Sequence, residues 1–441
     1  MPSRLPLTQL AVLGAALFAA VITELLPVGL LPQLADAFDV GERQVGWWVS
    51  AYALVVAGAA IPLTALLARW PRRQALLVLL AVYAAGNALI LVAPAYWVGL
   101  AGRILGGVAH AGIFSVAFAS AASLAPPGRA GRAVAIVNAG VAPAWALGLP
   151  AATAAGTAWG WRWPFAAAIA VIVLLAVAVA RFIPAPPPIT DSPAAASTAA
   201  SAATPSSAAP SSAAESAAGR QTDTRHMPAD RPSGSSGVLA SLRGRGLQLI
   251  GLTTVVLTIG HYSAYTYVTP LLLRAGVEQS GVSLILLGYG VASSLGLFLA
   301  GAFVDRHLGP SLRVAIAVTA AALLAIAALT HSVAGTVAVV LVWGVSFSAL
   351  PILINTAALR VSAVPDAAPA VVNAMWNVGI ASGAWVGGLA LQSGGSSRVA
   401  LVAGLLVTSS LVLTGVRSAW RAGERSSDRP ADAPSIAGQA R

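Results

Sequence analysis

The sequence predicts an all-α membrane protein whose twelve transmembrane helices form two parallel six-helix bundles. Apolar runs of roughly 20 residues, the length at which a helix spans a bilayer, recur along the whole chain. Of the 441 residues, 58% are hydrophobic and only 9% are charged, whereas charged residues make up about a quarter of soluble domains. Helices are expected because lipid offers no partners to unpaired backbone groups, and the runs are too apolar for barrel strands.

The apolar runs fall into two groups of six. The first run follows Arg4, as in a signal peptide, but it continues through Leu34 without a clear cleavage site, so we interpret it as a retained helix. The spans expected in the first half cover residues 8–32, 45–68, 75–93, 98–121, 133–156 and 164–183. Those expected in the second half cover residues 247–273, 282–304, 312–330, 335–359, 371–392 and 399–416.

A segment rich in Pro, Ala and Ser, without aromatic residues, separates the two groups. Such a composition cannot bury a core, so we expect a disordered cytoplasmic linker, and the C-terminal tail looks similar. The predicted organisation is an N-terminal bundle at 1–183, a linker at 184–245, a C-terminal bundle at 246–416 and a cytoplasmic tail at 417–441.

The arginines predict the orientation, because positively charged loops stay in the cytoplasm. All 25 basic residues are arginines. Arg103 lies within a span, twenty others fall on one side, and the opposite side carries Arg43, Arg162, Arg274 and Arg398. Both termini are therefore expected in the cytoplasm. The arginines stand singly or in small groups, which argues against a nucleic-acid-binding face.

The sequence lacks the residues and motifs that several kinds of functional site require. The absence of cysteine excludes disulfides and thiolate metal sites, and the five histidines show no metal-ligand spacing. No phosphate-binding loop, HExxH or GxSxG motif is present. We therefore expect no metal, no cofactor and no enzyme activity.

The two halves repeat each other. Tyr52 and Gly107 correspond to Tyr289 and Gly344 at a spacing of 237 residues. Arg69 of the loop "TALLARWPRR" corresponds to Arg306 of "GAFVDRHLGP" at the same spacing. Two parallel repeats place a binding site near the bilayer midplane between them, and alternating access then comes from rocking one half against the other.

Several motifs resemble the major facilitator superfamily, in particular the drug/proton antiporter branch with its arabinose-efflux-like and chloramphenicol-efflux-like carriers. They are "TELLPVGLLPQLA" in the first span, "GRILGGVAHAG" in the fourth, "GLPAAT" in the fifth, and "GHYSAYTYVTPLL" and "WGVSFSALP" in the second half. The resemblance implies transport of a small molecule coupled to protons.

The resemblance also implies roles for individual residues. Arg103 matches the arginine of the family's fourth helix, which is implicated in coupling. Asp305 and Arg306 match a loop motif that latches the two halves in one conformation. The first-half copy keeps Arg69 but has Ala68 in place of the acid, so a latch is doubtful there. The alternative role for these charges is to set the topology.

Glu24 is the acidic residue that lies deep within a span. A carboxylate in mid-membrane costs a few kcal/mol even on lenient scales, so it normally faces a cavity or a partner. If protons drive transport, Glu24 is the natural carrier, and we hypothesise that it pairs with Arg103 when ionised. The alternatives are a permanent structural ion pair and, for Arg103, an arginine that reaches the membrane interface.

Aromatic, amide and histidine side chains suit the lining of a cavity for an amphipathic or sugar-like substrate. The candidates are His110, Phe114, Asn138, His261, Tyr262, Tyr265, Trp343, Phe347, Asn355, Asn373, Trp376 and Asn377. For each residue singly, helix packing is the simpler interpretation.

These observations predict a proton-coupled exporter of small organic molecules such as drugs, sugars or metabolites. An uncoupled facilitator, an uptake symporter and a non-transporting sensor remain alternatives. We expect a monomer in the bacterial inner membrane whose partners are substrate, protons and lipid.

Overall fold

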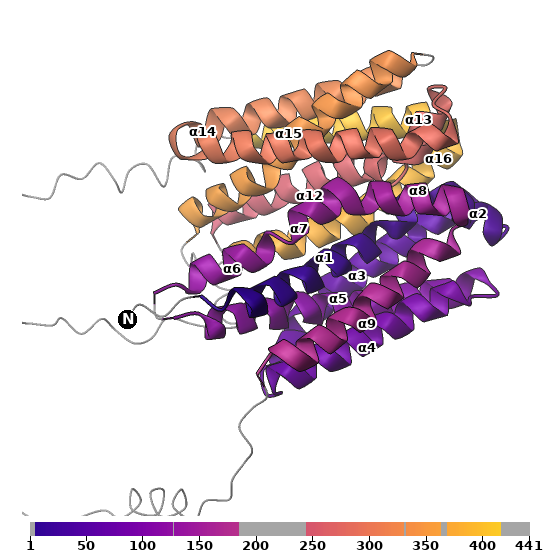
Figure 1. Cartoon of the computed structure of the whole chain (residues 1–441). Helices are drawn as coiled ribbons and strands as arrows, with labels where there is room; N and C mark the ends of the chain where they lie inside the picture. The colour runs from indigo at the N-terminus through magenta and orange to yellow at the C-terminus, as the bar shows by residue number, and fades with distance from the viewer. Residues whose placement is uncertain (1–4, 127, 185–243, 330–331, 363–367, 416–441) are drawn as a thin grey trace, which may run out of the picture.

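The computed structural model describes residues 5–126, 128–184, 244–329, 332–362 and 368–415. Within these ranges the chain forms helices and no strands. Two groups of long helices lie side by side, the first coloured indigo to magenta and the second orange to yellow (Figure 1). The predicted all-α fold is therefore confirmed.

The first bundle contains the predicted first six spans. The first span runs through α1 (Leu7–Gly29) and its continuation α2 (Leu31–Ala37). The fifth consists of four short pieces, because a turn at residues 139–140 separates α6 from α7 and the π-helical segment η1 separates α7 from α8. The remaining elements are α3 (Glu42–Leu67), α4 (Arg72–Leu91), α5 (Tyr96–Leu124), α6 (Ala130–Asn138), α7 (Val141–Pro143), η1 (Ala144–Gly148), α8 (Leu149–Trp159) and α9 (Arg162–Phe182).

The second bundle contains the other six spans in fewer elements. They are α12 (Arg245–Tyr265), α13 (Val268–Arg274), α14 (Gln279–Ala328), α15 (Val333–Val361) and α16 (Ala368–Thr414). The proposed linker and tail lie outside the described residues, apart from the two ends of the linker.

Two of these helices are long enough to contain two membrane spans each. The 47 residues of α16 would make a straight helix of about 70 Å, more than twice the ~30 Å of a hydrocarbon core. The helix is broken at Gly394 and Gly395, and the φ of +67° at Gly395 is one that glycine adopts without strain. Likewise, α14 is broken at His307 into the spans Gln279–Val304 and His307–Ala328.

Small residues let helices approach closely within the second bundle. Gly379, Gly383 and Gly387 follow one another at every fourth position of α16. A Cβ added to Gly383 would lie 2.8 Å from the carbonyl oxygen of Ile259 on α12. Because real Cβ atoms do not approach so closely, this line of glycines sets the packing distance between the two helices.

The internal repeat is visible in the packing of equivalent residues. A Cβ added to Gly107 would lie 2.9 Å from the carbonyl oxygen of Tyr52, and one added to Gly344 would lie 2.9 Å from that of Tyr289. The same glycine-to-tyrosine approach therefore joins two helices in each bundle.

The two bundles meet along a seam near the end of α3 that carries Arg43. Arg43 donates through Nη1 to Oε1 of Gln392, and Ser50 Oγ donates to the carbonyl oxygen of Ala381 at 2.8 Å. Towards the opposite end of α3, a Cβ added to Gly58 would meet no atom within 4 Å. The hydrogen bonds of Arg43 and Ser50 join the bundles at the end of α3 that carries Arg43.

Candidate functional site

Glu24 lies in α1 with 17% of its side chain exposed. Pro27 follows it within the helix. Proline lacks the N–H that would bond to the carbonyl four residues earlier, so the carbonyl of Thr23 has no partner within the helix. This local defect makes the backbone beside Glu24 an acceptor for a side chain from another helix.

Arg103 of α5 supplies that donor. It is 1% exposed, and its Nη1 donates to the carbonyl oxygen of Thr23 at 2.9 Å. Its Nη2 donates to the backbone carbonyl oxygen of Glu24 at 3.0 Å, and its guanidinium lies 4.0 Å from the ring centre of Tyr52. The Nε–H group is buried and has no hydrogen-bond partner among the described residues.

His110 of α5 provides the side chain that faces the Glu24 carboxyl group. Its Nε2 lies 3.9 Å from Oε2 of Glu24. Its ring stacks on Phe114 with centroids 4.6 Å apart. The structure thus places His110 against the carboxyl group, while Arg103 holds the backbone of the same helix.

Two tyrosine hydroxyls continue from the far side of the His110 ring. The hydroxyl of Tyr52 on α3 lies 2.8 Å from Nδ1 of His110 and 3.0 Å from the hydroxyl of Tyr83 on α4. The Tyr83 hydroxyl donates to the carbonyl oxygen of Ala20 on α1 at 2.7 Å. Sequence reasoning missed this chain, because a tyrosine in an apolar helix looks like a packing residue.

A second cluster surrounds His261 on α12, in the other bundle. Trp343 Nε1 donates to Nδ1 of His261 at 3.1 Å. The ring of His261 stacks on Phe347 and Tyr265, with centroids 3.2 and 5.2 Å apart. Trp145 of η1 reaches Tyr265 from the first bundle at 5.7 Å. The cluster therefore lies where the two bundles meet, and it is aromatic where the Glu24 cluster is charged.

The remaining predicted residues are scattered around these clusters. Tyr262 lies against His261, and Trp376 lies against Phe347 with centroids 5.8 Å apart. Asn377 is buried and donates to the carbonyl oxygen of Asn373 at 3.0 Å. Asn138, Asn373 and Arg69 are exposed, Asn355 is half-buried, and the side chains of Asp305 and Arg306 lie outside the described residues.

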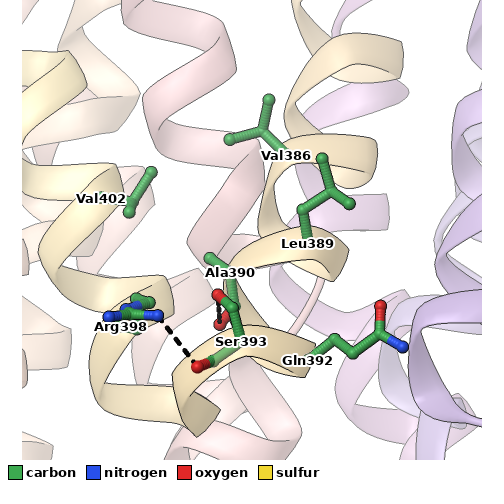
Figure 2. Close-up of a pocket in the computed structure, with 7 residues that line it drawn as sticks. All are labelled: Val386, Leu389, Ala390, Gln392, Ser393, Arg398 and Val402. Atoms are coloured by element: carbon green, nitrogen blue, oxygen red, sulfur yellow. Dashed lines mark hydrogen bonds between the residues drawn. The ribbon is translucent and has the colours of Figure 1, made fainter.

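A pocket of about 540 Å³ lies at the bend of α16, and none of its lining residues belongs to either cluster (Figure 2). Apolar side chains of Val386, Leu389 and Val402 line it. Arg398 closes one side, where its Nη1 donates to the carbonyl oxygen of Ser393 at 2.9 Å. Because Gln392 also lines it, the pocket adjoins the seam. The described residues hold no group of three metal-ligating side chains.

Known proteins share this architecture and sequence. Two solved structures resemble the fold: a bacterial homologue of the human lysosomal transporter Spinster, inward-facing and unoccupied (TM-score 0.69, 14% identity, 98% of this chain and 100% of that one), and the human organic anion transporter TETRAN (TM-score 0.61, 17% identity, 93% and 100%).

In sequence, the chain is 30% identical over 409 residues to proteins named "Chloramphenicol efflux pump" from two strains of Mycobacterium tuberculosis, covering 90% of this chain and 89% of each relative. The sequence pattern of the Major Facilitator Superfamily matches residues 12–384. With its paired helical bundles and its transporter relatives, this multi-pass membrane protein belongs to the Major Facilitator Superfamily.

Proposed function

We propose that the protein exports small organic molecules by proton antiport with alternating access. One observation carries the proposal: the carboxyl group of Glu24 is held within a span beside His110, with Arg103 bonded to the same stretch of α1. An ionisable side chain at that depth is costly unless it serves a pathway. Glu24 is therefore the proton carrier, and substrate export follows its loss and gain of a proton.

The aromatic cluster around His261 is the proposed substrate-binding surface. It joins the two bundles through Trp145 and Tyr265, which is where parallel repeats place a binding site. Flat aromatic walls with a few polar groups suit amphipathic molecules. The name of the mycobacterial relatives supports an efflux substrate of drug type, and sugars or other metabolites fit the same chemistry.

The predicted orientation gives the proposal its direction. With both termini in the cytoplasm of a bacterial inner membrane, the seam at Arg43 lies on the outer side, so the bundles are closed at their outer end. Such a state takes substrate from the cytoplasm. A monomer suffices, because each chain contains both halves. Asp305, Arg306 and Arg69 form the proposed latch on the inner side, and the protein works as a carrier and not as an enzyme.

Proton movement in liposomes tests the proposal. The purified protein is reconstituted with the pH dye pyranine inside, and chloramphenicol, which carries no charge, is added outside. An antiporter exchanges entering chloramphenicol for leaving protons, so the lumen becomes alkaline. The Glu24→Gln variant, which cannot release a proton, abolishes the pH change, and Glu24→Asp retains part of it.

Each alternative gives a different signal in the same vesicles. A symporter acidifies the lumen, a facilitator carries chloramphenicol without a pH change, and a sensor binds it without flux. Any of these results in the wild-type protein would overturn the proposed antiport.

A further inference from the structure

We propose that Tyr52 and Tyr83 are positioning residues that hold neutral His110 in one tautomer, with its proton on Nδ1 and its unprotonated Nε2 facing Glu24. This inference extends the proposed function, since it says how the proton carrier is presented with a partner. It is carried by the hydrogen-bond chain that runs from His110 through two hydroxyls to the backbone of α1.

Counting the protons available to these hydrogen bonds shows which group donates in each of them. A carbonyl oxygen can only accept, so the single proton of the Tyr83 hydroxyl is donated to Ala20. The contact between Tyr83 and Tyr52, with its oxygens 3.0 Å apart, must then use the proton of Tyr52. With that proton in use, the oxygen of Tyr52 can only accept from His110, and Nδ1 of His110 must carry a proton.

Donation in the opposite direction, from Tyr52 to His110, would leave the contact between Tyr52 and Tyr83 without a proton. If Tyr52 donated to Nδ1 of His110, the two tyrosine oxygens would face each other at 3.0 Å with no proton between them, because Tyr83 has already donated to Ala20. Two buried lone pairs at that distance repel. The carbonyl at the end of the chain thus determines the proton position on a ring three groups away.

This tautomer makes the contact with Glu24 depend on one proton. Nε2 of the neutral ring is an acceptor, and it lies 3.9 Å from Oε2 of Glu24, a gap that a small approach or one water closes. With a proton on the carboxyl group or on Nε2, the two groups attract each other. With neither protonated, a carboxylate faces a lone pair and is repelled.

Arg103 offers the ionised carboxylate another partner. Its Nε–H is buried without a hydrogen-bond partner among the described residues, while Nη1 and Nη2 already donate to the backbone carbonyls of Thr23 and Glu24. Loss of the proton therefore drives the carboxylate from His110 to Arg103. The groups that surround this exchange are Tyr52 of α3, Tyr83 of α4, Arg103 of α5 and Tyr262 of α12. The three tyrosines lie within electrostatic reach of Glu24.

The second bundle provides an internal contrast. In that copy Trp343, which can only donate, bonds to Nδ1 of His261, so neutral His261 carries its proton on Nε2. The two buried histidines are thus expected to show opposite tautomers within one molecule.

Nitrogen NMR of the histidine-labelled full chain in lipid nanodiscs measures this directly. The ¹⁵N shifts distinguish the two tautomers, and His110→Gln identifies the signal of His110. Above the pH at which the histidines titrate, we expect the Nδ1–H form at His110 and the Nε2–H form at His261. The Nε2–H form at His110 in the wild-type protein would overturn the inference, and this result requires no other variant.

Tyr83→Phe is the sharpest variant, because Tyr83 does not bond to His110. Without the Tyr83 hydroxyl, Tyr52 is free to donate to Nδ1, so the tautomer of His110 should change by about fivefold or more in favour of Nε2–H, the ratio that one neutral hydrogen bond corresponds to. Tyr83 has no tyrosine counterpart in the other bundle, because the residue 237 positions later is Ala320. The control is therefore Tyr289→Phe, which removes the hydroxyl of the Tyr52 counterpart and should leave the His110 signal unchanged.

The vesicle assay completes the test. Tyr83→Phe should displace the pH profile of chloramphenicol-driven proton movement, and Tyr289→Phe should not. An unchanged tautomer in Tyr83→Phe would overturn the inference. If the wild-type tautomer is as expected but no protons move with substrate, the proposed antiport fails while the positioning of His110 stands.

Discussion

His261 occupies in α12 the place that Glu24 occupies in α1. The two residues are related by the same spacing of 237 that relates Tyr52 to Tyr289. Their neighbours correspond as well, because His110, which faces Glu24, is replaced in the second copy by Phe347, which stacks on His261. One copy of the repeat thus carries Glu24 and His110 where the other carries the stacked rings of His261 and Phe347.

This division predicts separate effects for the two histidines. His261→Gln should raise the KM for chloramphenicol roughly tenfold, which corresponds to about 1.4 kcal/mol, and leave the pH profile of transport in place. His110→Gln should alter the pH profile and change KM little. Transport rates measured over a range of substrate concentration and pH separate the two effects, and equal changes in both variants would contradict the division.

The Pro27→Ala substitution tests the helix defect beside Glu24. Alanine restores the N–H that bonds to the carbonyl of Thr23, so this N–H competes with Arg103 for the same acceptor. Proton-coupled exchange in vesicles should fall about tenfold or more, while the unfolding temperature does not fall, because the helix gains a regular hydrogen bond. The control is Pro62→Ala in α3, a proline within a helix remote from this contact, and equal losses in both variants would refute the role of Pro27.

The glycine line between α16 and α12 predicts a loss of stability. In Gly383→Ala, the new methyl group would lie 2.8 Å from the carbonyl oxygen of Ile259, and such overpacking costs about 1–3 kcal/mol. Gly58→Ala places a methyl group where no atom lies within 4 Å, and alanine favours a helix by up to about 1 kcal/mol. Thermal unfolding monitored by tryptophan fluorescence should therefore shift down in the first variant and not in the second.

Closure of the seam can be tested by a disulfide. The chain has no cysteine, so Ser50→Cys with Ala381→Cys introduces the only pair. The hydrogen bond of 2.8 Å between these residues implies backbones close enough for a disulfide. Oxidation should cross-link the two halves and stop transport, and a reducing agent should restore it. Each single variant is the control, and transport that continues in the fully cross-linked protein would contradict alternating access at this seam.

Hydropathy predicted the spans well because the cost of exposing a backbone to lipid leaves helices as the only solution for such runs. The positions at which a helix continues or breaks are harder to predict from hydropathy than the spans themselves. Two predicted spans join into α14 with a break at His307, and the fifth span is divided around η1. Both features depend on packing between helices, and the sequence does not show which helix will be the neighbour.

The candidate site was predictable where a residue was out of place. Glu24 stands out as a charge in an apolar run, whereas Tyr52 and Tyr83 gain meaning only from the carbonyl and the imidazole that other helices bring to them. Pro27, four residues after Thr23, was a readable signal that the carbonyl of Thr23 needed an outside donor. The amides of Asn138 and Asn373 turned out exposed, because residue type does not reveal which way a helix faces.

The two copies of the repeat carry different side chains at equivalent positions, and this difference has an evolutionary consequence. In the proposed mechanism, proton coupling belongs to the Glu24 cluster of one copy and substrate binding to the aromatic cluster around His261 in the other. Selection for a new substrate can then act on the second copy without disturbing proton coupling in the first. Under that mechanism, a hybrid gene that joined the first half of this protein to the second half of a relative would take its coupling ion from one parent and its substrate preference from the other.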